Sequence, residues 1–332
     1  MIIAGASGLI GRALVAELKD DWSITVLTRE VRGDEPAGTE AVAWNPSAAA
    51  DGDVAHLEGL SRLLEGADVL VNLAGAPIAE GRFDEAHKRR ILDSRVHATT
   101  TLVEAAARCE VAPRTWIQAS GSGAYGDRGE EDLDERSPLG DDFMAEVARA
   151  WEGAAAPAAE RSRLVVARIG IVLDRDATAW KRLVLPVRLF VGGPIAGGRM
   201  WWPWIHSEDL VRALIWAIRT PEVEVRDGEL AGEARAASNG DAPLRREAVE
   251  GPYVLCAPEP ARQIDLTRAA ARVLRRPSFV PVPAFALRIL FGGMPDHLLL
   301  PSTKAHPRKL LRQGFAFRHP DADAAARDLL RG

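Results

Sequence analysis

The stretch Gly5-Ala6-Ser7-Gly8-Leu9-Ile10-Gly11 stands directly behind the short apolar run of residues 1–4. This order, a strand followed by a glycine turn and a helix, is the arrangement that binds the pyrophosphate of a dinucleotide. Gly5 permits the tight turn, Gly8 lets the backbone approach a phosphate because it has no Cβ, and Gly11 lets the helix pack closely on the strand. The sequence therefore predicts a nucleotide cofactor bound by Gly5, Ser7, Gly8, Leu9, Ile10 and Gly11.

The composition is that of an ordinary globular protein. The chain has 332 residues, of which 47% are hydrophobic and 27% charged, and its formal net charge is −5. These values give no reason to expect nucleic acid or an anionic membrane as a partner. No apolar run approaches the ~20 residues of a membrane span, and no signal peptide is expected. Cys109 and Cys256 are too few for a disulfide framework, and the seven histidines lack ligand spacing, so we expect no metal and a cytoplasmic protein.

Strand-like and helical segments alternate through the first half of the chain. After the first strand, apolar runs predict strands at residues 23–28, 68–73, 115–120 and 164–171, and helical periodicity is found at 83–109 and 142–160. This alternation is typical of α/β proteins, and we expect a Rossmann-type doubly wound parallel sheet. Residues 1–174 are assigned to this NAD(P)-binding domain, to which segments near 205–220 and 252–258 return.

The pattern changes after residue 174, and residues 175–332 are predicted to form mainly a smaller C-terminal α+β substrate lobe. Ser207 is the expected N-cap of a helix that has carboxylates in its first turn. Residues 222–251 are rich in charge, Ala and Gly without periodicity, so we expect a surface excursion that takes no part in the cofactor site.

The end of the second strand distinguishes between the two nicotinamide cofactors. An NAD site usually has a carboxylate there, about 20 residues past the glycines, to bind the ribose hydroxyls. This strand ends instead in Thr28 and Arg29, and a guanidinium can pair with the 2′-phosphate of NADP. NADP(H) is therefore the expected cofactor. Glu30 is the rival ribose ligand, and a solvated Arg29 is the alternative interpretation.

Small and polar residues follow two further strands, at the carboxyl edge where open α/β sheets bind ligands. Asn72-Leu73-Ala74-Gly75 would let the cofactor pass over the sheet, although a structural turn needs Gly75 just as much. Ser120-Gly121-Ser122-Gly123-Ala124-Tyr125-Gly126 places hydroxyl groups at the same edge. The cofactor contacts expected beyond the glycine turn are Thr28, Arg29, Leu73, Ala74, Gly75, Ser120 and Arg168.

With these motifs the chain resembles the extended short-chain dehydrogenase/reductases, and in particular their atypical branch, an epimerase family with a C-terminal domain of unknown function. The resemblance runs nearly end to end. Its further matching motifs are Arg82-Phe83, Ser94-Arg95, Ala124-Tyr125-Gly126, Trp151-Glu152, Gly192-Gly193-Pro194, Trp204-Ile205-His206, Arg276-Pro277, Pro307 and Gly314-Phe315-Ala316-Phe317. The resemblance implies an NAD(P)-dependent oxidoreductase or epimerase and leaves the substrate undefined.

The chain departs from that superfamily at all three catalytic positions. The resemblance implies a Ser or Thr, a Tyr that acts as acid and base, and a Lys four residues after it. The helix that follows Asp142 begins Phe143-Met144-Ala145-Glu146-Val147, and we expect Phe143 and Val147 to occupy the Tyr and Lys positions. The hydroxyl position, four residues before Tyr125, is a glycine.

Nonstandard groups are therefore expected to carry the chemistry. Tyr125 is the only tyrosine near the expected nicotinamide edge, and without a lysine its pKa should stay near ~10, which suits an acid better than a base. Ser122 or Ser120 would supply a hydroxyl. The catalytic residues predicted on this basis are Tyr125 and Ser122.

The predicted substrate pocket contains Trp204, His206 and Arg95, each with a competing interpretation. His206 titrates in a useful range, but it also suits a hydrogen bond at a helix start. The tryptophans near Trp204 either line a pocket or pack between the two lobes. Arg95 and Lys88 share one helix face and either meet an anionic substrate or face water.

Two functions follow from these features. The leading hypothesis is an NADP(H)-dependent oxidoreductase or epimerase that acts on an unidentified small metabolite. The rival is a catalytically inactive NADP(H)-binding regulatory or sensor protein, which the apolar Phe143 and Val147 favour. The expected partner is a small-molecule substrate, with no nucleic acid and no membrane, and a homodimer is left open.

Overall fold

The computed structural model describes residues 1–79, 83–226 and 244–331, so Arg82 of the matching motifs lies outside the described residues. Its centre is a seven-stranded sheet in which all neighbouring strands run parallel. From one edge to the other the strands are β13 (Gly251–Leu255), β7 (Arg163–Ile169), β5 (Thr115–Gly121), β4 (Val69–Asn72), β1 (Ile2–Ala4), β2 (Thr25–Thr28) and β3 (Glu40–Ala43). The predicted Rossmann-type sheet is confirmed.

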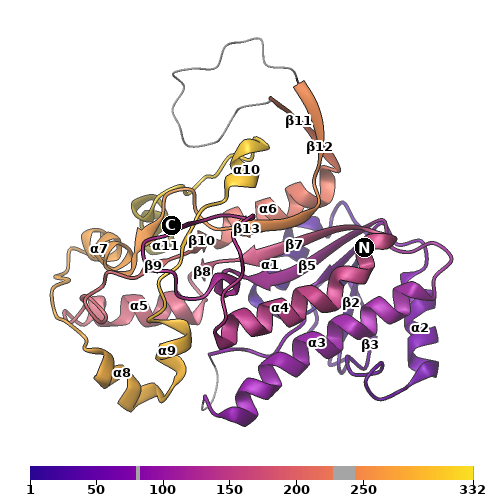
Figure 1. The fold of residues 1–332 in the computed structure, drawn as a ribbon, viewed down its shortest axis with the longest axis horizontal. Coiled ribbons are helices and arrows are strands. Elements are labelled where there is room, and N and C mark those ends of the chain that lie inside the picture. The colour runs from indigo at the N-terminus through magenta and orange to yellow at the C-terminus, as the bar shows by residue number, and fades with distance from the viewer. Residues whose placement is uncertain (80–82, 227–243, 332) are drawn as a thin grey trace.

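Each face of the sheet has its own core, because successive residues of a strand point to opposite faces. Ile3 belongs to the core shared with α1 (Leu9–Leu18) and α6 (Ser207–Arg219). Ile2 belongs to the core shared with α2 (Val54–Leu64) and α3 (Glu85–Ala107). Helices thus cover both faces, as Figure 1 shows. Helix α4 (Phe143–Ala155) packs beside α3 and β5.

The strand predicted at residues 164–171 is interrupted at Gly170. A Cβ at this position would lie 2.5 Å from the carbonyl oxygen of Pro203, so the two backbones approach too closely for any other residue. The chain leaves the main sheet there, and β8 (Ile171–Leu173) pairs with β10 (Trp204–His206) instead. The predicted single strand was therefore wrong at its end.

The C-terminal part contains short strand pairs and a group of helices. Besides β8 and β10, β9 (Trp201–Trp202) pairs with β14 (Ala261–Arg262), and β6 (Asp132–Leu133) with β15 (Lys304–Ala305). The helices are α5 (Thr178–Arg188), α7 (Gln263–Leu274), α8 (Ala284–Phe291), α9 (Met294–Leu298), α10 (Arg308–Arg312) and α11 (Ala322–Arg331). Figure 1 shows α5, α7, α8 and α9 at the end of the molecule opposite α2. The α+β character predicted for this lobe is confirmed.

The predicted surface excursion begins and ends as regular structure. Strands β11 (Glu222–Arg226) and β12 (Leu244–Ala248) form an antiparallel pair, which projects from the sheet in Figure 1. Residues 227–243 of the excursion lie outside the described residues. Across the described part of the chain, no helix combines the length and the hydropathy needed to cross a membrane.

Candidate cofactor and substrate site

The glycine turn joins β1 to α1 at the point where the strand order reverses, between β1 and β4. Gly5 has a φ of +85°, and a Cβ on it would lie 2.7 Å from the carbonyl carbon of Leu73. A Cβ on Gly11 would lie 2.5 Å from the carbonyl oxygen of Gly5. Both positions therefore require glycine, and the turn holds the start of α1 close to the end of β4.

The N-terminus of α1 is open to an anion. Gly8 is its N-cap and supplies no side-chain cap, and the first turn contains no acidic residue. The N–H groups of this first turn have no partner within the helix, and the positive end of the helix dipole lies at the same place. The exposed Arg12 donates from Nη1 to the carbonyl oxygen of Ser7. Arg12 follows the third glycine directly and was not among the predicted site residues.

Arg29 is exposed directly after β2. Within the described chain it makes no hydrogen bond or ion pair, so its N–H donors are free for a ligand. Glu30, the rival ribose ligand, is instead paired with Arg32 at 2.9 Å. Thr28 donates from Oγ1 to the carbonyl oxygen of Glu30 at 2.9 Å and so fixes the end of the strand.

A cavity of about 250 Å³ lies at the carboxyl edge of the sheet, beside the glycine turn. Ile10 contributes to it from α1, and the ends of β4, β5 and β7 and the helices α3 and α4 supply its other walls. It brings together three predicted cofactor contacts, Ile10, Leu73 and Ser120, and one predicted substrate residue, Arg95. The other two predicted substrate residues do not line it.

Helix α4 faces the cavity with a stripe of residues at i, i+3, i+4 and i+7, namely Met144, Val147, Ala148 and Trp151. Phe143 lies outside this stripe. Its ring packs edge-to-face on Phe83, with 5.9 Å between centroids, and on His297 at 5.8 Å. Phe143 therefore does not line this cavity, contrary to the expectation that it stands at the Tyr position facing the site, and Met144 and Ala148 form an i, i+4 pair that does. The wall is apolar at both positions.

Ser120 lines the cavity, and the ion pair between Arg168 and Glu152 holds its hydroxyl in place. Its Oγ donates to Oε1 of Glu152 at 2.7 Å, while Arg168 donates to both carboxylate oxygens of Glu152 at 2.9 Å. The Arg168 and Glu152 side chains are only 8% and 15% exposed. Arg168 was predicted as a cofactor contact, but its guanidinium is engaged by Glu152 instead.

Tyr125 and Ser122, the predicted catalytic residues, do not line the cavity. Tyr125 is fully buried, and its hydroxyl accepts a hydrogen bond from Nη1 of Arg168 at 3.0 Å. Burial raises the pKa of Tyr125 despite the nearby positive charge of Arg168, so it is a poor acid as well as a poor base. Strand β5 ends at Gly121, and Ser122 begins a 3-10 turn. The candidate hydroxyl is therefore Ser120 rather than either predicted residue.

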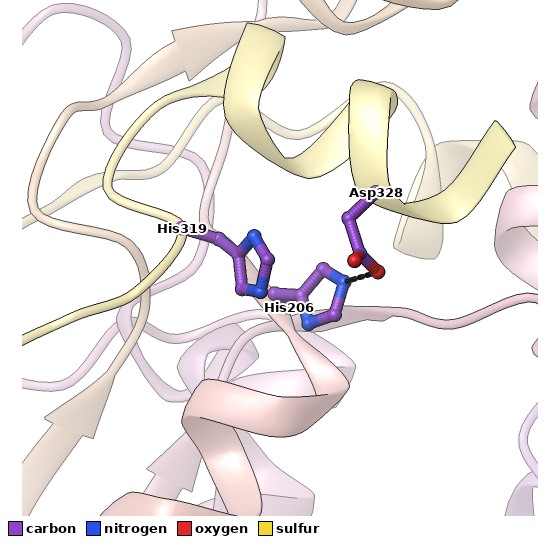
Figure 2. A group of neighbouring side chains, drawn as sticks. All are labelled: His206, His319 and Asp328. Atoms are coloured by element: carbon purple, nitrogen blue, oxygen red, sulfur yellow. Dashed lines mark hydrogen bonds and ion pairs between the residues drawn. The ribbon is translucent and has the colours of Figure 1, made fainter. Parts of the chain in front are cut away.

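His206 and Trp204 have packing roles in this structure. Figure 2 shows His206 between His319 and Asp328. Nδ1 of His206 accepts from the backbone N–H of Glu208 at 3.1 Å and caps α6, one residue before the predicted N-cap, as the competing interpretation of this histidine expected. Trp204 is 1% exposed and lies in an apolar core cluster.

The group in Figure 2 has the composition of a metal site, since His206, His319 and Asp328 bring ligand atoms within 4.8 Å of one another. The two imidazole rings are stacked, with centroids 3.7 Å apart and planes 23° apart. Stacked rings direct their nitrogen lone pairs nearly parallel rather than toward a common ion. Nε2 of His206 lies 3.2 Å from Oδ2 of Asp328, and we interpret the group as a hydrogen-bonded link between α6 and α11.

Comparison with known proteins identifies the family to which the chain belongs. Residues 1–146 match the NAD dependent epimerase/dehydratase family, and residues 282–329 match a domain of unknown function, DUF1731. The epimerase family protein SDR39U1 of Bos taurus is 31% identical over 334 residues, which cover 99% of each chain. The chain belongs to this epimerase family. The resemblance inferred from the motifs is confirmed.

Other epimerase-family proteins match over similar lengths. Epimerase family protein ML0860 of Mycobacterium leprae is 32% identical over 319 residues, covering 96% of this chain and 91% of the relative. The crystal structure of the human epimerase family protein SDR39U1 (isoform 2) with NADPH superimposes with a TM-score of 0.78, at 28% identity and over 99% of this chain and 98% of that one. In this epimerase-family chain, the first match covers the glycine turn and the start of α4, and the second covers α8 to most of α11.

Proposed function

We propose that this epimerase-family protein binds NADP(H) and carries out oxidoreductase or epimerase chemistry on a small metabolite. The observation that carries the proposal is the cavity that Ile10, at the start of α1, shares with Ser120 and Arg95 beside the point where the strand order reverses. Open α/β sheets bind their ligands at this point. The NADPH in the human relative's structure supports the choice of cofactor.

The residues present fit the cofactor along its length. The first-turn N–H groups of α1 and the side chain of Arg12 would hold the pyrophosphate. Arg29 would pair with the 2′-phosphate. Ile10 and Leu73, which line the cavity, would contact the nicotinamide half. When bound, NADP(H) supplies or accepts a hydride at the substrate carbon.

Ser120 and Glu152 would move the proton that accompanies the hydride. When an alcohol is oxidised, its O–H proton passes to Oγ of Ser120 while the serine proton passes to Glu152, and carbonyl reduction reverses both transfers. The 2.7 Å hydrogen bond between the two side chains provides the path. Arg168 pairs with both oxygens of this carboxylate and holds it beside Ser120.

A second candidate is an NADP(H)-binding regulatory or sensor protein without turnover. The apolar Met144 and Ala148 favour it, because they stand at the cavity where a Tyr and Lys pair would act. Absence of any NADPH consumption across a broad set of small carbonyl compounds, together with tight NADPH binding, would select this candidate.

We also propose a reducing compartment such as the cytoplasm. Cys109 and Cys256 are both buried free thiols, and burial raises the pKa of both, with that of Cys256 well above its ordinary value. Neither thiol is reactive in this state, and the fold therefore does not depend on an oxidising environment.

Arg29→Ala tests the cofactor assignment. We expect NADPH affinity to fall about 10- to 150-fold, which corresponds to about 1.5–3 kcal/mol for a hydrogen-bonded charge, and NADH affinity to stay unchanged. Calorimetry with both cofactors measures the two values. Arg32→Ala, which removes an exposed arginine already paired with Glu30, is the matched control. Equal affinity of the unaltered protein for NADPH and NADH would overturn the assignment.

Ser120→Ala and Tyr125→Phe together test the assignment of the hydroxyl. Ser120→Ala should reduce kcat at least about 100-fold, the lower end of acid–base contributions, with NADPH affinity retained. Tyr125→Phe should change kcat less than about threefold, because the buried phenol takes no part in proton transfer. Steady-state NADPH consumption with small keto acids gives both values. If the Tyr125→Phe protein is folded but shows no turnover, Tyr125 is the catalytic hydroxyl and this assignment is wrong.

A further inference from the structure

Arg95 is a buried cation without a carboxylate partner among the described residues. It is 7% exposed. Its Nη1 donates to the carbonyl oxygens of Ala76 and Ile91, both at 3.0 Å, and its guanidinium carbon lies 4.9 Å from the ring centroid of Trp151. None of these neighbours carries a negative charge. Burial lowers the pKa of Arg95 to about 10, which leaves it protonated at neutral pH.

Arg168 is a cation of similar burial that does have a carboxylate partner. Arg168 is 6% exposed and has Glu152 on two of its N–H groups. A buried charge without a counter-charge is costly. Among the described residues Arg95 has no such partner, so a bound anion would stabilise it.

The geometry leaves Arg95 able to accept that anion. Arg95 lines the cavity with Ser120. The described residues accept hydrogen bonds from its Nη1 and from neither Nε nor Nη2, and these two atoms form a fork that matches a carboxylate or phosphate. Gly75 leaves room for the guanidinium, because a Cβ there would lie 3.0 Å from its central carbon.

Ser120 adds a second, directional requirement. Its proton is donated to Glu152 at 2.7 Å, so toward a ligand its oxygen can act only as an acceptor. A ligand beside it must therefore donate, as a hydroxyl group does. The remaining walls, which include Met144 and Val147, suit a short carbon skeleton.

We propose that the cavity recognises a small anionic hydroxy compound, whose carboxylate or phosphate binds Nε and Nη2 of Arg95 and whose hydroxyl donates to Ser120. The cavity volume of about 250 Å³ is below the roughly 300–1,000 Å³ of pockets for drug-sized ligands. The nicotinamide half of the cofactor would take part of this volume at Ile10 and Leu73, so only a small substrate fits beside it. This inference rests on the proposed function, because the hydroxyl carbon is the one that would exchange a hydride.

The test is a calorimetric titration of the protein saturated with NADP⁺. Four probes separate the two requirements, namely lactate, propionate, 1,2-propanediol and glycerol 3-phosphate. Lactate or glycerol 3-phosphate should bind at least about tenfold more tightly than propanediol, and lactate more tightly than propionate. The preference between lactate and glycerol 3-phosphate identifies the anion. Equal binding of all four, or binding of none, would overturn the proposal.

Variants assign the effect to the residues. Arg95→Met should weaken the preferred anion about 10- to 100-fold without changing NADP⁺ affinity, and Arg95→Lys should restore part of it. Ser120→Ala should weaken lactate and leave propionate unchanged. Arg89→Met, at an exposed position of the same helix, is the matched control. Undiminished anion binding in Arg95→Met contradicts the proposal, and so does an equal loss of NADP⁺ affinity, which would assign Arg95 to the cofactor.

The two proposals fail in distinguishable ways. If the protein without cofactor binds the anion through Arg95 but binds no NADPH, the proposed function fails and the anion site stands. If NADPH binds with an affinity that depends on Arg29, but no probe loses affinity in the Arg95 variants, only the proposed anion site is wrong. Should both Arg95 variants fail to fold, the order of the four probes on the unaltered protein decides.

Discussion

Glu152→Ala should lower the free energy of unfolding by about 3–5 kcal/mol, the range found when one partner of a buried ion pair is removed. The change leaves the guanidinium of Arg168 buried without its carboxylate and takes away the acceptor of the Ser120 hydroxyl. Because the two charged side chains are 8% and 15% exposed, water cannot replace the missing charge. Urea denaturation followed by circular dichroism measures the change.

Glu222→Ala is the matched control for this prediction. Glu222 pairs with Arg246 at 2.8 Å, but the arginine and glutamate side chains are 70% and 51% exposed, so its removal should change the free energy of unfolding by at most about 1 kcal/mol. The double variant Glu152→Ala with Arg168→Met should recover much of the loss, because no unpaired charge remains. Equal effects of Glu152→Ala and Glu222→Ala would show that the Glu152–Arg168 pair is hydrated in solution.

Met144→Tyr combined with Ala148→Lys should raise the rate of carbonyl reduction about 10²- to 10⁴-fold, the contribution of a positioned acid–base pair. Both positions line the cavity and are one helical turn apart on α4. The introduced ammonium would lower the pKa of the introduced phenol and place it to donate a proton to a carbonyl oxygen. NADPH consumption with pyruvate and glyoxylate, in the double variant and the unaltered protein, measures the gain.

The control is the same substitution at the two positions that the sequence alone predicts for the Tyr and Lys. Phe143→Tyr with Val147→Lys puts the new phenol against Phe83 and His297, outside the cavity, so no comparable gain is expected. Thermal melts and NADPH affinity show whether each double variant is intact. Activity in this pair and not in the other would mean that the cavity described here is not the nicotinamide site.

The two double variants also show where sequence patterns stop being informative. The glycine turn and the strands β1, β2, β4 and β5 were predictable, because each depends on neighbouring residues. Positions 143, 144, 147, 148 and 151 are all apolar, so two overlapping stripes are compatible with a helix. Contacts of Phe143 with His297, far along the chain, select between them.

The misplaced hydroxyl has a similar cause. Ser120 and Ser122 would share a side if β5 continued, but the strand ends at Gly121. Tyr125 is buried among Val254, Cys256 and Ala305, which come from distant segments. That Arg95 has no carboxylate partner among the described residues could not be predicted either, since a sequence shows a charge but not whether a second charge lies beside it.

The position of β13 has a consequence for biosynthesis. This strand, Gly251–Leu255, completes the sheet by pairing with β7, yet α5, α6 and the β11–β12 hairpin are translated between the two. Until residues 251–255 leave the ribosome, the outer edge of β7 presents unpaired N–H and C=O groups, which promote strand association between nascent chains. The central sheet is therefore completed only after residues 251–255 have been synthesised, and during this interval the growing chain carries an exposed strand edge.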